Sequence, residues 1–216
     1  MFDFGGVISK TLFETHAQTE SALGLAPGTL TWRGPFAPES DPLWRQMQSD
    51  AISEREYWLI RSREVGALLG EHWSDMQTLV RRARGAEPDR IVRPQVVQLV
   101  NQAKEKGIRL CVLSNELDLF YGSELRQRLS LLKDFELIVD ATYTGILKPD
   151  PRAYQACLDG LNLEARECLM IDDQQRNVEG ALALGISAVA FDVMNPLGSC
   201  ERVRSYFTGA SGAIVY

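Results

Sequence analysis

The second half of the chain alternates between amphipathic segments and short apolar runs. Residues 94–106 carry apolar side chains at helical spacing, which predicts a helix, and residues 108–113 form a continuous apolar run typical of a buried parallel strand. The alternation continues with strands expected near 137–139, 168–171 and 188–191 and helices near 117–132, 151–161 and 177–184. This order predicts an α/β fold built on a doubly wound parallel sheet with right-handed crossovers.

Residues 12–85 have a different pattern. Their apolar residues recur at helical spacing, and no convincing run of β-branched residues interrupts them. Two helix starts have capping-box spacing, Ser53 with Glu56 and Ser74 with Gln77. We therefore expect a helical unit in this part of the chain.

The two patterns together predict a core domain with an insertion. We expect the α/β core to comprise residues 1–11 and 86–216, and a helical cap to comprise residues 12–85. The tail from 195 to 216 has weak periodicity, so we assign no element there.

Composition narrows the class of protein. The 216 residues include 29 acidic and 23 basic side chains, a formal net charge of −6, and 45% are hydrophobic, which is typical of a globular protein. An acidic balance argues against nucleic acid and anionic membranes as partners, because phosphate surfaces attract an excess of lysine and arginine. No stretch approaches the roughly 18 apolar residues of a membrane helix. The four cysteines lack C-x-x-C spacing, so we expect reduced thiols and a cytoplasmic location.

Polar side chains follow the apolar runs at several places. They are Asp3 after a very short N-terminal extended segment, Ser114 with Asn115, Lys148, and Asp172 with Asp173. Because ligands in doubly wound sheets bind beyond the carboxyl ends of the strands, we expect these side chains to form one site.

The chemistry of this set points to phosphate. Three carboxylates brought together repel one another unless a cation lies among them, and a site of few carboxylates and other oxygen ligands suits Mg²⁺. Lys148 would add a second positive charge, and Ser114 with nearby amides could bind phosphate oxygens. Such a set is what a protein needs to move a phosphoryl group.

These motifs, in this order, resemble those of the haloacid dehalogenase superfamily, specifically its phosphatase branch with a helical cap. The matching stretches are 2–7 (FDFGGV), 113–115 (LSN), 148–151 (KPDP), 171–173 (IDD) and 177–181 (NVEGA). The helical insertion lies where that family places its cap. The resemblance implies Mg²⁺-dependent hydrolysis of a small phosphorylated metabolite, a sugar phosphate among the candidates, through an aspartyl-phosphate.

The resemblance also implies a role for each matching residue. Asp3 matches the nucleophile, and Lys148 matches the lysine that neutralises the nucleophile and the phosphate. Ser114, with Asn115 beside it, matches the phosphate-binding motif. The implied metal ligands are the carboxylates of Asp3, Asp172 and Asp173 and the backbone carbonyl of Gly5, with Asp172 linked through water or to the lysine.

Two features depart from the family pattern. Gly5 stands where most of its phosphatases carry a second aspartate, which protonates the leaving group and then activates water. Because a general acid or base contributes about 10²–10⁴-fold, a leaving group that needs little protonation, such as that of an acyl phosphate, would suffer least. Only two residues precede Asp3, which predicts either a truncated central strand or a start upstream.

Other interpretations stay open. A 2-haloacid dehalogenase also uses an aspartate nucleophile, without a metal, but normally lacks the paired acids that Asp172 and Asp173 form here. A catalytically weak binding or regulatory protein would accommodate Gly5. In the cap, the aromatic residues are best explained as packing, and His16 and Trp32 are the first candidates for substrate contact because they lie nearest the first motif in sequence.

Overall fold

The computed structural model describes residues 1–207, which form two compact units that we treat separately. The sheet unit comprises Met1–Lys10, Asp89–Asp118 and Arg126–Tyr216, and the helical unit comprises Thr11–Pro88 and Leu119–Leu125. Our expected cap of residues 12–85 differs from this unit, which starts at Thr11, extends to Pro88 and also includes residues 119–125, which we expected in the core. Part of the tail that we left unassigned, residues 208–216, lies outside the described residues.

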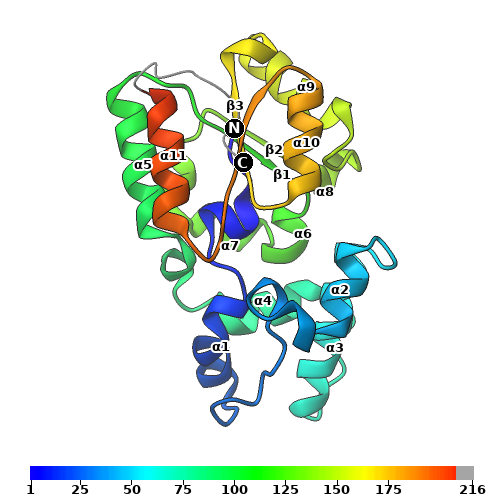
Figure 1. Cartoon of the computed structure of the whole chain (residues 1–216). Coiled ribbons are helices and arrows are strands. Elements are labelled where there is room, and N and C mark those ends of the chain that lie inside the picture. The colour runs from blue at the N-terminus through cyan, green and yellow to red at the C-terminus, as the bar shows by residue number, and fades with distance from the viewer. Residues whose placement is uncertain (208–216) are drawn as a thin grey trace. The chain divides into compact units, whose positions relative to one another are not determined.

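Two pairs of parallel strands form the sheet (Figure 1). They are β1 (Cys111–Ser114) with β2 (Leu137–Asp140), and β3 (Leu169–Asp172) with β4 (Ser187–Ala190). Phe2 joins the two pairs, because it bridges in parallel to Val112 of β1 and to Ile171 of β3. Its N–H donates to the Cys111 carbonyl at 2.8 Å, and the next N–H, that of Asp3, donates to the Ile171 carbonyl at 2.9 Å. The very short N-terminal segment therefore occupies the centre of the sheet.

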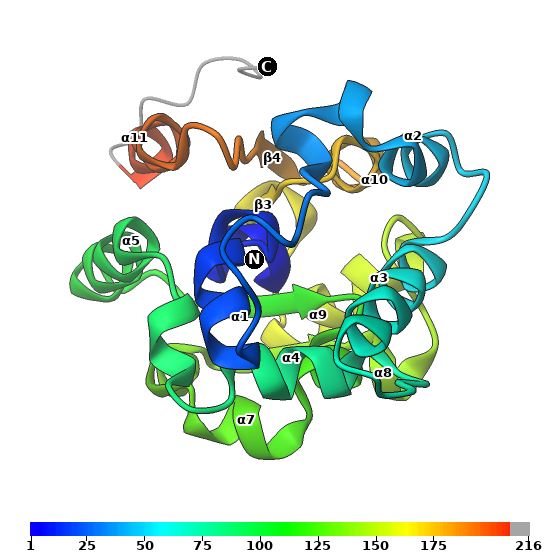
Figure 2. The same cartoon turned by 90° about the horizontal axis from the view of Figure 1, so that it is seen from below.

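Helices cover both faces of this sheet (Figures 1 and 2). One face carries α9 (Pro151–Leu161) and α10 (Gln175–Ala183), and the other carries α5 (Pro94–Glu105) and α11 (Pro196–Phe207). Apolar strand residues such as Leu113 and Met170 share a buried cluster with α9 and α10. Apolar side chains on both faces of short strands account for the continuous apolar runs in the sequence. The predicted doubly wound α/β fold is confirmed.

Two elements of the sheet unit depart from the predicted bounds. The first strand begins at Cys111 rather than at Ile108, because the Ile108 N–H bonds back to the Ala103 carbonyl at 2.9 Å and completes the end of α5. The tail, which we left unassigned, contains α11, which begins at Pro196.

The helix expected over residues 117–132 is instead two short helices. They are α6 (Leu117–Tyr121) and α7 (Ser123–Arg128), followed by a single turn at Ser130–Asp134. Gly122 separates them with a φ of +75°, a left-handed conformation that ends a helix and that glycine adopts without steric cost. A further short helix, α8 (Ala141–Thr144), follows β2 and was not predicted.

The helical unit contains α1 (His16–Leu23), α2 (Pro42–Gln48), α3 (Glu54–Leu68) and α4 (Met76–Arg84). The capping box of Ser53 and Glu56 at the start of α3 is confirmed. The box predicted for Ser74 and Gln77 is wrong. The α4 helix is capped one residue later by Asp75, whose carboxylate accepts the Thr78 N–H at 2.7 Å and satisfies the same free donors.

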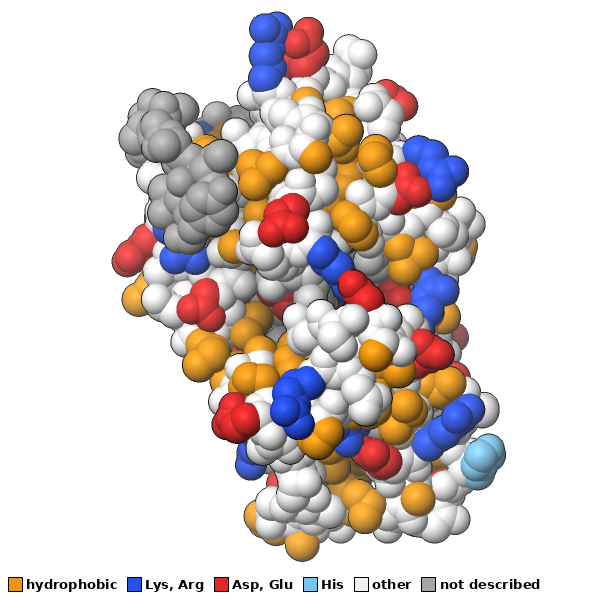
Figure 3. Space-filling view, turned by 45° about the vertical axis from the view of Figure 1, so that its right-hand side comes forward, with side chains coloured by type: hydrophobic (Ala, Val, Ile, Leu, Met, Phe, Trp, Pro, Cys, Tyr) orange, Lys and Arg blue, Asp and Glu red, His pale blue; other side chains and the backbone are white. Residues whose placement is uncertain are grey.

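The surface and the helix lengths add two observations. On the face drawn in Figure 3, acidic and basic side chains are interspersed, so the net charge of −6 does not gather into one patch there. Among residues 1–207, every helix is too short or too polar to span a bilayer.

Candidate active site

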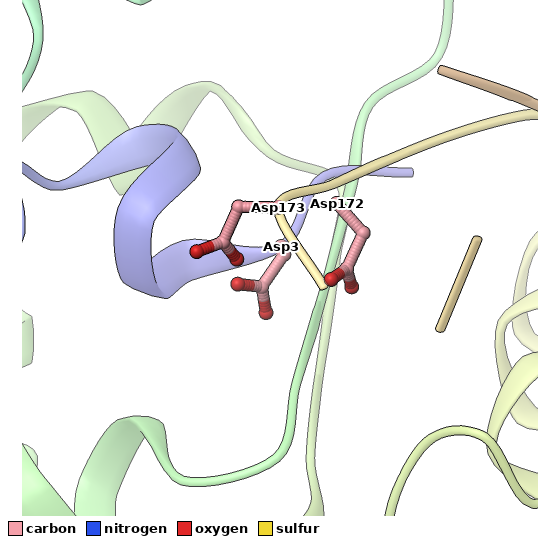
Figure 4. A group of neighbouring side chains, drawn as sticks. All are labelled: Asp3, Asp172 and Asp173. Carbon is pink, nitrogen blue, oxygen red and sulfur yellow. The ribbon is translucent and has the colours of Figure 1, made fainter. Parts of the chain in front are cut away.

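Three aspartates converge at the carboxyl ends of the central strands (Figure 4). Asp3 follows Phe2, and Asp172 ends β3 with Asp173 next in the chain. One carboxylate oxygen from each of the three lies within 4.8 Å of the others. Asp3 and Asp172 are buried and Asp173 is half-buried. The expectation that strand ends bring these residues together is therefore met in the geometry.

Lys148 lies between two of these carboxylates. Its Nζ donates to Asp3 Oδ1 and to Asp172 Oδ2, both at 2.6 Å, and its side chain is buried. Burial alone would lower the pKa of this ammonium, but the facing carboxylates of Asp172 and Asp3 outweigh burial and raise the pKa above its ordinary value. Lys148 is thus a fixed positive charge shared by Asp3 and Asp172.

The charges of this cluster do not balance. Three carboxylates and one ammonium leave two negative charges when all four groups are ionised. Several carboxylates close together in a largely buried site repel one another, so the cluster favours an additional cation. Its ligand atoms are carboxylate oxygens, which select a hard divalent ion over a soft one. The acidic cluster therefore fits a divalent metal in both charge and donor chemistry.

Asp172 is held on both of its oxygens. Oδ2 accepts the Lys148 ammonium, whereas Oδ1 accepts the Gln174 N–H at 2.9 Å and the Asn177 Nδ2–H at 3.0 Å. Of the two links that the resemblance allowed for Asp172, through water or to the lysine, the geometry contains the link to the lysine. Asn177, on the first turn of α10, orients this carboxylate.

Asn115 holds the main chain of Lys148. The Lys148 N–H donates to Asn115 Oδ1 at 2.7 Å, and Asn115 Nδ2 donates to the Lys148 carbonyl at 3.1 Å. Ser114, which ends β1, is buried, and its Oγ accepts the Glu116 N–H at 3.4 Å. In the contacts described, the side chain of Asn115 therefore positions the lysine. Phosphate binding by Ser114 and Asn115 stays a prediction.

The two glycines after Asp3 are not equivalent. Gly5 has φ and ψ of −68° and 131°, which any residue adopts, whereas Gly6 has a φ of +75°. A Cβ added to Gly6 would lie only 2.7 Å from Asp173 Cγ, so only glycine fits beside this carboxylate. The turn is held by Arg93, whose Nε donates to the Gly6 carbonyl at 2.9 Å.

Sequence reasoning missed Arg93. It is buried, and its guanidinium carbon lies 5.6 Å from the ring centroid of Phe191. The available signal was a charged residue directly after Ile91 and Val92 and directly before the proline that starts α5. A charge in such an apolar setting is rarely buried without a specific partner.

His16 and Trp32, the candidates for substrate contact, lie in the helical unit within an aromatic cluster of Phe13, His16, Trp32, Trp44, Tyr57 and Trp58. The rings of His16 and Trp32 are 4.2 Å apart between centroids, and the two residues are only 5% and 6% exposed. Burial, then the nearby Arg33, lowers the pKa of His16 to about 4. Packing accounts for both side chains, and a role in substrate selection stays a prediction.

Comparison with known proteins adds a family and named relatives. A family model described as haloacid dehalogenase-like hydrolase matches residues 1–185. Acyl-CoA dehydrogenase family member 10 of Mus musculus is 36% identical over 46% of this chain and 9% of its own length. Phosphatase MT3486 of Mycobacterium tuberculosis is 32% identical over 46% of each chain. This chain therefore spans less than half the length of either relative. Sesquiterpene phosphatase astK of Aspergillus oryzae is 23% identical over 94% of this chain and 93% of its own.

Solved structures share the fold. YfnB of Bacillus subtilis, a HAD-hydrolase solved with bound magnesium, has a TM-score of 0.61 at 16% identity and covers 87% of this chain and 83% of its own. The L-2-haloacid dehalogenase of Xanthobacter autotrophicus has a TM-score of 0.56 at 20% identity and covers 97% and 86%. At these identities the likeness establishes the fold alone, and it includes both a metal-bound hydrolase and a dehalogenase.

Proposed function

This chain belongs to the haloacid dehalogenase-like hydrolases, and we propose that it is a Mg²⁺-dependent phosphatase of small phosphorylated metabolites that works through an aspartyl-phosphate on Asp3. The observation that carries the proposal is the site itself, where three carboxylates lie close together and one ammonium, that of Lys148, bonds to two of them. The phosphatase relatives support the same reaction class.

Asp3 is the proposed nucleophile. Its Oδ1 is bonded to Lys148, which orients the carboxylate and offsets the repulsion between it and an approaching phosphate. Attack on phosphorus would form the aspartyl-phosphate and expel the leaving group on the opposite side. Asn115 keeps Lys148 in place by bonding its main chain on both sides.

The proposed metal ligands are Asp3, Asp173 and the Gly5 carbonyl, with Asp172 beside them on the lysine. When bound, Mg²⁺ would offset the repulsion among the carboxylates and polarise the phosphoryl oxygens. Gly6 supports this arrangement, because its missing side chain leaves the room that the Asp173 carboxylate occupies. The hydroxyl of Ser114, at the end of the neighbouring strand, is the proposed donor to a phosphate oxygen.

The test is phosphate release from p-nitrophenyl phosphate with Mg²⁺. Asp3→Asn keeps the size of the side chain but removes the nucleophile, and we expect kcat/KM to fall by at least about 10³-fold. Asp150→Asn is a matched control. Its carboxylate caps α9 and pairs with exposed Arg152 outside the acidic cluster, so its activity should persist. Equal rates for wild type and Asp3→Asn would overturn the proposal.

Two competing functions would give different results in these assays. Dehalogenation with an aspartate nucleophile uses no metal, so it would leave the three clustered carboxylates without a divalent cation and is disfavoured here. Halide release from a 2-haloacid that EDTA does not affect would replace our proposal with that reaction. Mg²⁺-dependent binding of phosphate esters without turnover, across a broad metabolite panel, would instead identify a binding protein.

A further inference from the structure

The position two residues after Asp3 is Gly5, which has no side chain although its backbone conformation does not require glycine. Gly5 is exposed, and a Cβ built there meets Asp3 Oδ2 at 3.9 Å, an ordinary van der Waals contact, as its nearest neighbour. At Gly6, by contrast, both the positive φ and the close Asp173 carboxylate exclude a side chain. A Cβ would therefore fit at Gly5, so neither the backbone conformation nor a close contact requires glycine there.

The two polar side chains bonded around the nucleophile are already engaged. Lys148 already donates to Asp3 and Asp172, and both oxygens of Asp172 are occupied. A side chain at Gly5 would flank Asp3 and could carry the missing proton.

We propose, building on the proposed phosphatase activity, that the substrate is an acyl phosphate, whose leaving group departs as a stable carboxylate. Asp3 Oδ2 would attack phosphorus, a new P–O bond would form, and the P–O bond to the acyl group would break. The electron pair goes to the leaving carboxylate, which needs no proton near neutral pH because carboxylic acids have pKa values of about 4.

The second step has the same property. Water attacks the phosphorus of the aspartyl-phosphate, and the P–O bond to Asp3 breaks with its electron pair returning to the Asp3 carboxylate. The proton that water loses goes to the released phosphate or to solvent. Both steps therefore expel a carboxylate, and neither needs a general acid. Alkyl esters such as sugar phosphates would have to expel an alkoxide and would lose about 10²–10⁴-fold without one.

The experiment compares leaving groups in three proteins with Mg²⁺ present. The substrates are acetyl phosphate, p-nitrophenyl phosphate, phenyl phosphate and glycerol phosphate, and the readout is kcat/KM, which reports the first displacement. The proteins are wild type, Gly5→Asp and the matched control Gly5→Asn, which has nearly the same shape but no acidic proton.

We expect wild type and Gly5→Asn to prefer acetyl phosphate and to fall steeply as the leaving group becomes more basic. Relative to Gly5→Asn, Gly5→Asp should raise the ratio of kcat/KM for glycerol phosphate to that for acetyl phosphate on the order of 10²-fold, the low end of a positioned general acid. The wild-type series alone tests the inference if the variants fail to fold.

Several results would overturn the inference. Equal wild-type activity on glycerol phosphate and acetyl phosphate would mean that another group supplies the proton. Glu116, which follows the Ser114–Asn115 motif, is the first candidate, and Glu116→Gln would then lose the alkyl ester selectively. If kcat/KM falls steeply with the basicity of the leaving group and falls just as steeply in Gly5→Asp, then Gly5 has no role in this preference. No turnover of any of the four substrates would instead remove the phosphatase activity itself, a separate failure.

Discussion

Asp41 in the helical unit and Asp172 in the sheet unit are both fully enclosed aspartates, and each is bonded to a basic side chain at 2.6 Å. Around Asp41 there is one buried carboxylate for one cation. Arg61 supplies the positive charge and also pairs with the exposed Glu64, the Tyr57 hydroxyl donates at 2.9 Å, and the N–H groups of Trp44 and Gly34 complete the partners of Asp41. Every oxygen of Asp41 is used, and the network is closed.

Around Asp172 the same kind of ion pair belongs to a cluster with more carboxylates than ammonium groups. Lys148 serves Asp3 as well as Asp172, and Asp173 adds a third carboxylate within ligand distance. A balanced buried pair specifies structure, whereas an unbalanced cluster retains affinity for a cation. Burial of an aspartate therefore does not by itself identify a site. The number of clustered carboxylates that share one basic side chain does.

The largest expected effect comes from removing the basic partner in each region. Lys148→Met would leave Asp3 and Asp172 buried without their counter-ion, and Arg61→Met would do the same to Asp41. Each should cost about 3–5 kcal/mol in the free energy of unfolding, measured with urea. Added Mg²⁺ should restore part of the loss in Lys148→Met and none in Arg61→Met. Equal recovery in both would contradict the distinction between the two regions.

A second prediction concerns the cation directly. Mg²⁺ at about 100 times its Kd should stabilise the wild type by about 2.7 kcal/mol, seen as a rise in Tm. Asp173→Asn should weaken Mg²⁺ binding by at least about 10-fold, because losing even an outer partner of a metal ligand costs that much. Asp41→Asn should be less stable and yet keep the Mg²⁺ response. Titration calorimetry checks the affinities, and an unchanged Kd for Asp173→Asn would exclude it as a ligand.

The smallest predicted effect is the change in the free energy of unfolding when His16, in the helical unit, is protonated. His16 faces Arg33, Glu20 and Arg61, and its pKa is about 4 in the fold against about 6.5 in the unfolded chain. The unfolded chain thus binds the proton more readily, so stability is full above pH 6.5 and falls as the pH drops toward 4. Between pH 7.5 and pH 5 the loss is about 2 kcal/mol.

His16→Phe keeps a ring in the aromatic cluster and removes the titration. Urea unfolding at the two pH values should therefore show a smaller loss in this variant than in the wild type. The same loss in both proteins would mean that His16 is not the group responsible.

Much of the fold was predictable from local pattern. Apolar runs and helical spacing located the four strands and most helices, because burial on both faces of a sheet demands such runs. Predictions failed where one residue changed the local geometry. Gly122 split an expected helix, and Asp75 capped α4 in place of Ser74.

The sequence by itself determined which chemical groups stand at the strand ends, since motif order and residue type are local properties. The tertiary structure decided how they combine. Phe2 pairs with strands on both sides, which brings Asp3 to the same edge of the sheet as Asp172. Lys148, 145 residues from Asp3 and 24 from Asp172, bonds to both. Only strand register and loop packing set such distances, so the charge balance of the site, and the difference between Gly5 and Gly6, emerge in three dimensions alone.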